Sequence, residues 1–178
     1  MQLRLALAAA VAAALAGTAA QAAPVSATAS ANANILAANQ VTATRDLDFG
    51  SIARPTTGST LVTVASAATG TATPALSGGN AFVPTSGQAR AATFHLVGTP
   101  GLTYSIQSNT LSFPGAGTNL GTPGPESPAA EAGTTLGTLP SSGTPGQQDL
   151  YVGGHFTIDA NTAVQSYTGA LVLTVNFN

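Results

Sequence analysis

The chain of 178 residues has no cysteine, no lysine and no tryptophan. Without cysteine it can form neither a disulfide nor a thiolate metal site. Without lysine it cannot form an intramolecular isopeptide bond. Charged residues make up 6% of the chain, against about 25% in a typical soluble domain. This composition gives no basic patch for nucleic acid or anionic lipid, and a nearly neutral surface favours association. We therefore expect any assembly to be non-covalent.

The first residues have the features of a secretory signal. Arg4 precedes an apolar run from Leu5 to Ala16, and Ala20-Gln21-Ala22 has the small-residue pattern of a cleavage site. The apolar run is shorter than the ~20 residues that cross a bilayer. We expect residues 1–22 to be a cleaved signal peptide and the mature protein to lie in the periplasm, on the outer surface or outside the cell. No stable membrane span is expected after cleavage.

The rest of the chain, residues 23–178, has the length of a single domain. Apolar and polar residues alternate in many short segments separated by Gly, Pro, Ser and Thr, and no stretch has a helical period. This pattern predicts an all-β fold, a β-sandwich of antiparallel strands of the immunoglobulin-like or pilin-like kind. The expected strands after residue 38 are 40–52, 61–64, 81–83, 90–97, 102–107, 150–152, 155–158 and 169–177.

The segment that follows the signal alternates strictly. Its apolar positions are Val25, Ala27, Ala29, Ala31, Ala33 and Ile35, and Ser, Thr and Asn lie between them. This alternation predicts an N-terminal strand with one small apolar face, within residues 23–37. The last segment alternates in the same way. Its apolar positions are Leu171, Leu173, Val175 and Phe177.

Residues 114–148 differ in composition from the rest. Gly, Pro, Ser and Thr dominate, and Glu126 and Glu131 are the only charges. This composition predicts a long exposed loop, with a possible short strand at 134–139.

Few residues have the chemistry of a catalytic or metal site. His95 and His155 are the only histidines, with Asp149 and Asp159 as nearby acids, and no metal-ligand spacing joins them. Asp46 and Asp48 share one strand face, where two acids more often form a solvated edge than an acid–base pair. The sequence has no Gly-x-Ser-x-Gly motif. We expect no enzyme activity, no cofactor and no metal.

Two groups of residues carry a resemblance to a family. Ala33-Asn34-Ile35 followed by Thr44 to Ile52, with Leu47-Asp48-Phe49-Gly50 at its centre, is similar to the start of the bacterial domain-of-unknown-function family 4402. Tyr151-Val152-Gly153-Gly154, Tyr167-Thr168-Gly169 and Leu173 to Phe177 resemble its end. The resemblance covers nearly the whole mature chain.

The same layout is similar, more distantly, to pilin-like subunits of archaic chaperone–usher systems and to spore-coat protein U. This resemblance implies that Val25 to Ile35 is a donor strand for a neighbouring subunit. It also implies that 169–177 is the strand with which a periplasmic chaperone pairs, with an usher as a further partner. Two features differ: the subunits commonly have a disulfide, and this donor segment carries alanine where bulky residues are usual. Burying its six apolar residues would contribute on the order of 7 kcal/mol.

Two functions follow as expectations. The first is a non-catalytic cell-surface structural protein, a fimbria-like or coat subunit that assembles by β-strand complementation. The alternative is a self-contained secreted β-sandwich binding module, an adhesin or a carbohydrate-contacting domain, that uses residues 114–148 as its contact surface. The sequence leaves open whether the first strand pairs within its own chain or with a neighbour.

Overall fold

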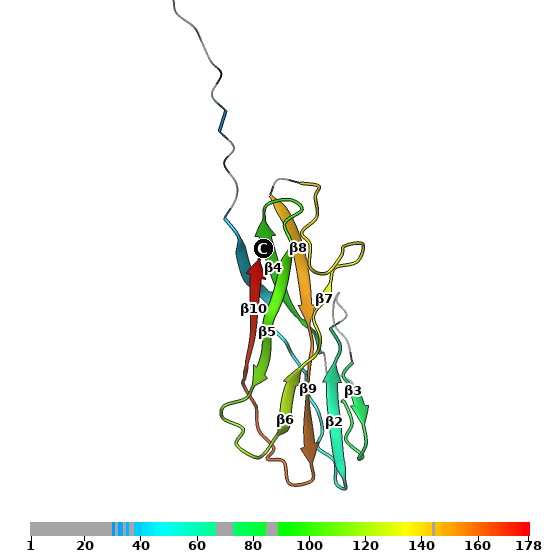
Figure 1. The fold of residues 1–178 in the computed structure, drawn as a ribbon. Helices are drawn as coiled ribbons and strands as arrows, with labels where there is room; N and C mark the ends of the chain where they lie inside the picture. The colour runs from blue at the N-terminus through cyan, green and yellow to red at the C-terminus, as the bar shows by residue number, and fades with distance from the viewer. Residues whose placement is uncertain are drawn as a thin grey trace, which may run out of the picture. The chain divides into compact units, whose positions relative to one another are not determined.

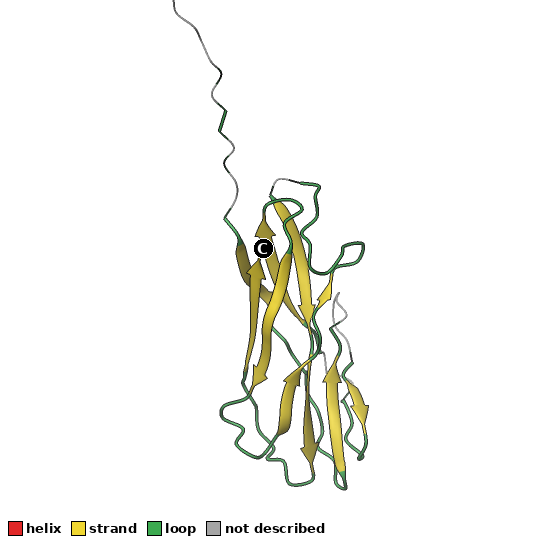
Figure 2. Cartoon of the chain, in the orientation of Figure 1, coloured by secondary structure: helices red, strands yellow, loops and turns green. Residues whose placement is uncertain are grey.

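The computed structural model describes residues 30, 32–33, 35, 38–66, 73–84, 89–143 and 145–178. The chain divides into residues 1–34 and residues 35–178, and the fold below is that of the second unit. All regular elements among its described residues are strands (Figures 1 and 2). Within the described ranges there is no helix long and apolar enough to cross a membrane.

Ten strands form three antiparallel sheets. The first has the order β1-β4-β8-β7, the second is the pair β10-β5, and the third has the order β3-β2-β9-β6. The strands are β1 (Gln40–Arg45), β2 (Ser59–Val64), β3 (Ala75–Ser77), β4 (Ala92–Gly98), β5 (Tyr104–Ser112), β6 (Gly121–Pro125), β7 (Ala129–Ala130), β8 (Gly146–Val152), β9 (Gly154–Asp159) and β10 (Ala170–Phe177).

The first two sheets pack face to face over one hydrophobic core. Phe94, Leu96, Leu150 and Val152 of the first sheet are buried against Tyr104 of β5. These residues alternate with outward polar ones along each strand, as a sheet with one buried face requires. The prediction of an antiparallel β-sandwich is confirmed, and the alternation of β4 and β10 located the inward faces correctly.

A second core lies under the third sheet. Val62 of β2 and Phe156 and Ile158 of β9 are buried together with Ala116 and Leu120 from the segment after β5. The two cores are joined because β8 and β9 are consecutive, so one nearly continuous stretch of chain passes from the first sheet to the third (Figure 1).

The residue between β8 and β9 is Gly153, which lies against the backbone of another strand. A Cβ atom there would overlap the carbonyl oxygen of Val64 and lie 2.7 Å from the carbonyl carbon of Ala65. The Gly153 N–H donates to Ser66 Oγ at 3.0 Å, and its carbonyl accepts from the Glu126 N–H at 3.1 Å. Only glycine permits this approach, so the crossing between sheets depends on it.

Residues 114–148 are more ordered than the sequence indicated. Strands β6 and β7 lie inside this range. Strand β8 begins at Gly146, before the predicted end of the loop at Gln148. Ala116, Leu120 and Leu139 are buried, which corrects the expectation that the segment is exposed throughout. The segment 134–139 forms one isolated bridge, between Thr138 and Thr103, in place of a short strand. These strands form through backbone hydrogen bonds and have few large side chains. The composition of the segment therefore did not predict them.

Three other expected strands differ in extent. The one at 40–52 ends at Arg45 and is followed by an isolated bridge of Asp48 with Arg90. The one at 81–83 is reduced to the bridge between Phe82 and Ala53. The one at 102–107 extends to Ser112. Residues 1–22 lie outside the described residues, and the signal peptide stays a prediction.

A buried polar network fastens the segment before β8 to the first core. The Tyr104 hydroxyl donates to Gln148 Oε1 at 2.6 Å, and Gln148 Nε2 donates to Thr134 Oγ1 at 2.7 Å and to the Thr135 carbonyl at 3.1 Å. Gln148 is 1% exposed. Burial raises the pKa of Tyr104, against a smaller lowering by the hydrogen bond with the Gly137 backbone, so the phenol stays a donor at neutral pH.

Substituting Gly153→Ala should destabilise the fold by about 1–3 kcal/mol or more, because the new methyl group overlaps the Val64 carbonyl oxygen. The matched control is Gly115→Ala, where a Cβ atom meets nothing within 4 Å. The control should change stability by less than about 0.5 kcal/mol. Urea unfolding of the two variants measures both values. Equal stability of the two would contradict the role assigned to the Gly153 crossing.

Tyr104→Phe should lower stability by about 1–3 kcal/mol at pH 7, since Gln148 Oε1 loses its buried donor. The control Tyr151→Phe removes a hydroxyl on the outward face of β8 and should have a smaller effect. The raised pKa of Tyr104 means that its contribution is complete below pH 10 and declines as the pH rises through the folded-state pKa. The variant should therefore lose less stability than the native chain between pH 9 and 11.

Candidate functional site

The structure contains a cleft between the segment that begins at the end of β1 and the segment that leads into β10. Its volume is about 900 Å³. Residues 43–54 form one wall, and residues 162–169 with Leu171 form the other. The floor is apolar and comes from both cores: Phe94, Leu111, Phe113, Leu120, Phe156 and Ile158. We call this cleft the edge groove.

Two strands reach the edge groove, β1 with its last residues and β10 with its first, and both are incompletely paired. In the described part of the chain, β1 pairs with β4 alone and β10 pairs with β5 alone. Each of the two therefore has one backbone edge without a neighbouring strand. Such an edge presents free N–H and C=O groups to any chain that comes to lie beside it.

The side chains of these two strands are also incompletely covered. All four inward residues of β10, namely Leu171, Leu173, Val175 and Phe177, pack against the first core but are only partly buried. Ala43, on the inward side of β1, is exposed. The side chains of β4 opposite them are buried. The first core is thus incompletely covered along β10, and Leu171 is the β10 residue that also lines the edge groove.

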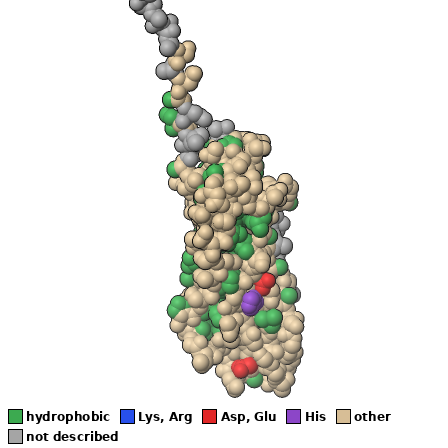
Figure 3. Space-filling view, viewed as in Figure 1, with side chains coloured by type: hydrophobic (Ala, Val, Ile, Leu, Met, Phe, Trp, Pro, Cys, Tyr) green, Lys and Arg blue, Asp and Glu red, His purple; other side chains and the backbone are tan. Residues whose placement is uncertain are grey.

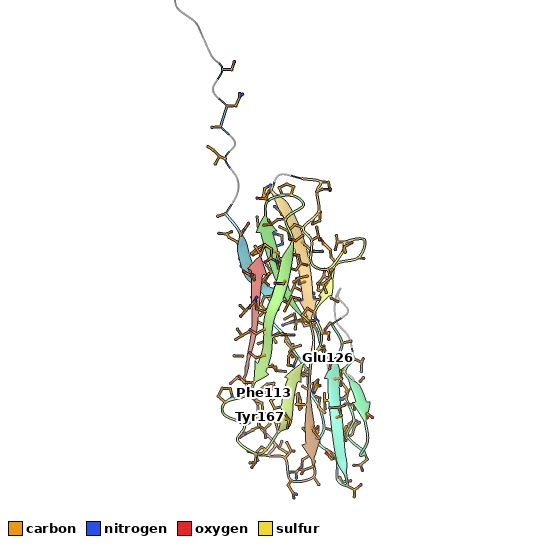
Figure 4. All side chains as sticks on the ribbon, viewed as in Figure 1. Phe113, Glu126 and Tyr167 are labelled. Atoms are coloured by element: carbon orange, nitrogen blue, oxygen red, sulfur yellow. The ribbon has the colours of Figure 1, made fainter. Side chains whose placement is uncertain are left out.

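Several of the residues that line the edge groove are aromatic. Phe49 lies with its ring centroid 4.7 Å from that of Phe156 and 6.2 Å from that of Phe113. Tyr167 packs on the same core and donates its hydroxyl to the Ala163 carbonyl at 2.8 Å. Figure 4 labels Phe113 and Tyr167, which lie close together near the start of β10. We call Phe49, Phe113, Phe156 and Tyr167 the aromatic floor.

The motif Leu47 to Gly50 forms part of this wall. Leu47 packs on the first core and Phe49 on the second. Asp48 Oδ1 accepts from the Gly50 N–H at 2.8 Å, and Gly50 has a φ of 69°, so the chain turns there. Asp48 also forms backbone hydrogen bonds with Arg90 and an ion pair with it at 3.6 Å, which is half-exposed. Asp46 and Asp48 are thus wall residues, and Asp48 holds the turn.

Two further motifs converge on the same place. Gly154 lacks a side chain where Leu47, Phe49 and Leu111 meet, since a Cβ atom would lie 2.7 Å from Leu111 Cδ2. Gly169 lies against the ring of Phe113, where a Cβ atom would approach Cδ1 at 2.7 Å. The sequence analysis identified these motifs only by resemblance. The structure shows that they shape one cleft.

Four charged residues line the edge groove, namely Arg45, Asp46, Asp48 and Arg54. Arg54 Nη1 donates to the Thr162 carbonyl at 2.9 Å and so joins the two walls at the lower end. Arg45 Nε donates to the Ala91 carbonyl at 3.1 Å, while its Nη2 is buried without a partner. Figure 3 shows how sparse charged side chains are on the face drawn there.

The two histidines lie away from the edge groove, each paired with an acid. His95 Nδ1 is 2.7 Å from Asp149 Oδ1, across the pairing of β4 with β8. His155 Nδ1 is 2.8 Å from Glu126 Oε1. Asp159 accepts from the Asn161 N–H at 2.8 Å and caps a turn. Among the described residues, no three His, Asp or Glu side chains come together as a metal site.

The predicted donor segment lies mostly outside the described residues. Val25, Ala27, Ala29 and Ala31 are among those not described, and the strand there stays a prediction. Ala33 and Ile35 are described; neither is in a strand, and Ile35 is 93% exposed. The Ile35 side chain is therefore almost entirely exposed to solvent.

The contact surface expected for a binding module at 114–148 is partly occupied. Phe113 belongs to the aromatic floor, and Glu126 is paired with His155.

Residues 39–177 match a protein family described as "Domain of unknown function (DUF4402)". Comparison with curated proteins and with solved structures gave no match. The matched range begins one residue before β1 and ends with β10, so it includes every strand and both walls of the edge groove.

Proposed function

Because the chain belongs to the DUF4402 family, whose description assigns no function, we propose its role from the geometry: it is an exported structural subunit that assembles by β-strand complementation. The strand that completes each subunit is the N-terminal segment Val25 to Ile35 of a neighbouring copy, and it lies in the edge groove. The observation that carries this proposal is the edge groove itself, a cleft with an apolar floor at the end of β1 and the start of β10, two strands that each lack a neighbour on one edge in the described chain.

The strand order supports the proposal. Seven-strand sandwiches of the immunoglobulin type have four strands in one sheet and three in the other. Here the four-stranded sheet β1-β4-β8-β7 faces a sheet of only two strands, β10-β5. The missing position is beside β10, on the side of β1. One added strand there would complete the layer and cover the first core.

The energetics support it as well. Full burial of a Val, Leu, Ile or Phe side chain is worth about 1.5–3 kcal/mol, and the four inward residues of β10 are only partly buried. Covering them completely would gain on the order of 3–6 kcal/mol, beside the hydrogen bonds of an added strand. The incoming segment itself contributes a comparable amount, as the sequence indicated.

The alanines of the donor segment fit this site. The positions that they would face already carry bulky side chains, namely Leu171, Leu173 and Val175 on β10 and Phe94 on β4. Interdigitating sheets require small residues opposite large ones, so bulky residues at every donor position would overfill the layer. A donor with alanine at its centre and larger residues, Val25 and Ile35, at its ends matches an edge groove of this form.

The same edge of β10 would serve a periplasmic chaperone before assembly. A partner strand placed along β10 would protect the open core until a second subunit replaces it. A chaperone and an usher are therefore the partners that we propose beside the second copy of the chain.

Removing the donor segment tests the proposal. A variant that keeps the signal but lacks residues 23–37, purified from the periplasm, should be monomeric, whereas the full chain forms oligomers. Size-exclusion chromatography with light scattering measures the masses, and thermal unfolding measures stability. If the full chain is monomeric and the deletion leaves its melting temperature unchanged, strand complementation is wrong.

A synthetic peptide with the sequence of residues 25–35 should stabilise the deletion variant. At a concentration 100 times its dissociation constant it adds about 2.7 kcal/mol, which corresponds to roughly 5–11 °C in melting temperature for a domain of this size. The control peptide differs by Ala29→Asp, which places a charge against the core, and should give no shift. Equal effects of the two peptides would show that binding does not use the alternating apolar face.

A further inference from the structure

We infer that the outer face of the first sheet, around Tyr151, binds a neutral sugar. This inference goes beyond the proposed assembly and does not depend on it. It follows from the position of one aromatic ring among groups that donate and groups that accept hydrogen bonds, on a face where opposite charges lie close together.

Two neighbouring rows of side chains cross the first sheet on this face. In one row, Arg45 of β1 pairs with Thr93 of β4, and Thr93 pairs with Tyr151 of β8. In the other row, His95 of β4 pairs with Asp149 of β8. The residues before and after them along β4 and β8 are buried. Because successive side chains of a strand point to opposite faces, both rows lie on the outer face of the sheet.

Glu131 joins these rows from the segment directly after β7. Its N–H donates to the Asp149 carbonyl at 3.0 Å. Burial raises the pKa of the Tyr151 phenol, and the negative charges of Asp149 and Glu131 raise that pKa further, whereas the charge of Arg45 lowers it. Such effects weaken with distance, so the three charged groups lie near the phenol. We call this group of side chains the outer cluster: Arg45, His95, Glu131, Asp149 and Tyr151.

The outer cluster offers both hydrogen-bond acceptors and hydrogen-bond donors. His95 Nδ1 lies 2.7 Å from Asp149 Oδ1, and the two side chains are 34% and 33% exposed. Arg45 Nε donates to the Ala91 carbonyl at 3.1 Å, which holds the guanidinium at the border of the cluster. Carboxylate oxygens only accept hydrogen bonds and a guanidinium only donates them. A sugar hydroxyl does both, so the hydroxyls of one sugar ring can pair with both kinds of group.

Tyr151 gives the outer cluster an apolar surface. Its side chain is half-buried on the outer face of β8, whereas Tyr104 and Tyr167 pack on the two cores. A tyrosine ring packs C–H groups on its faces and keeps its hydroxyl at one edge. A pyranose ring has C–H groups on its faces and hydroxyls around its rim. The Tyr151 ring and the polar groups beside it therefore match the two parts of a sugar, as polar groups around an apolar surface do in other ligand sites.

The charges of the outer cluster act against ligands that carry a net charge. Glu131 and Asp149 repel a carboxylate or a phosphate, and Arg45 repels an ammonium group, since like charges placed side by side disfavour binding. A neutral ligand with many hydroxyls meets neither repulsion. The outer face of the second sheet differs, because the exposed residues of β10, such as Val172 and Thr174, are neither charged nor aromatic. That face therefore supplies a matched control position.

Saturation-transfer difference NMR on the full chain tests the inference, because the method also works on large oligomers. The probes are the methyl glycosides of glucose, galactose, mannose and N-acetylglucosamine, at up to about 10 mM, a range that detects weak binding. At least one of them should bind. Tyr151→Ala should weaken that binding at least about fivefold, since it removes the ring. Tyr151→Phe keeps the ring and should weaken it less.

Two further variants test the polar groups and the position. Glu131→Gln, which replaces a charged acceptor by a neutral one of the same size, should weaken binding about fivefold. Thr174→Ala, on the outer face of β10, should bind as the native chain does. Thermal unfolding of each variant checks that the fold is kept, so that a loss of binding reports on the site.

The outcomes separate this inference from the proposed assembly. Binding that is lost in Tyr151→Ala and kept in Tyr151→Phe and Thr174→Ala supports a sugar site at the outer cluster. The inference is overturned if none of the four glycosides binds, or if Tyr151→Ala binds as well as the native chain. It is also overturned if glucuronate or choline, an anionic and a cationic probe, binds more tightly than every neutral glycoside. None of these results bears on strand complementation, which is tested by the mass of the full chain.

Discussion

The structure depends on a sandwich that has four strands in one sheet and two in the other, within the described chain. The last residues of β1 and the first of β10 reach the edge groove, and each of the two strands has one backbone edge without a neighbouring strand. The inward residues of β10 are only partly buried, although they have the same alternation as the buried residues of β4. A free backbone edge beside a partly covered apolar core is a place where a further strand can pair.

Other features of the fold shape the walls and the floor of the edge groove. The passage of chain from β8 to β9 at Gly153 connects the first sheet to the third, so the wall formed by residues 47–54 rests on two cores instead of one. Gly154 and Gly169 remove side chains where the floor would otherwise be filled. The Arg54 contact with the Thr162 carbonyl holds the two walls together at the lower end. In the assembly that we propose, a cleft that is already formed lowers the free-energy cost of binding, because the acceptor does not have to rearrange.

The sequence predicted those parts of the fold that rest on alternation of large apolar and polar residues. Residues such as Phe94, Leu96 and Leu173 have an unambiguous period of two, so β4 and β10 were located and their inward faces were correct. Strands β6 and β7 consist of Gly, Thr, Pro and Ala, whose side chains give no periodic signal, and they form because their backbones meet β9 and β8. The burial of Gln148 depends on Tyr104, which is 44 residues away, and local sequence contains no trace of that contact.

The edge groove itself could not be derived from sequence, because it is a property of strand order. Nothing in the pattern of residues 40–45 or 170–177 shows that β1 pairs only with β4 and β10 only with β5 in the described chain. The motifs around Leu47 and Tyr167 were singled out by resemblance alone. The structure shows that they lie on the two walls of one cleft.

The composition of the chain is consistent with the assembly that we propose. In the assembly that we propose, a chain without cysteine forms no disulfide and one without lysine forms no isopeptide bond, so burial and backbone hydrogen bonds hold the joint between subunits. A donor strand would supply both over its whole length. The low net charge would leave little repulsion between successive subunits. These features of the composition suit the proposed non-covalent assembly.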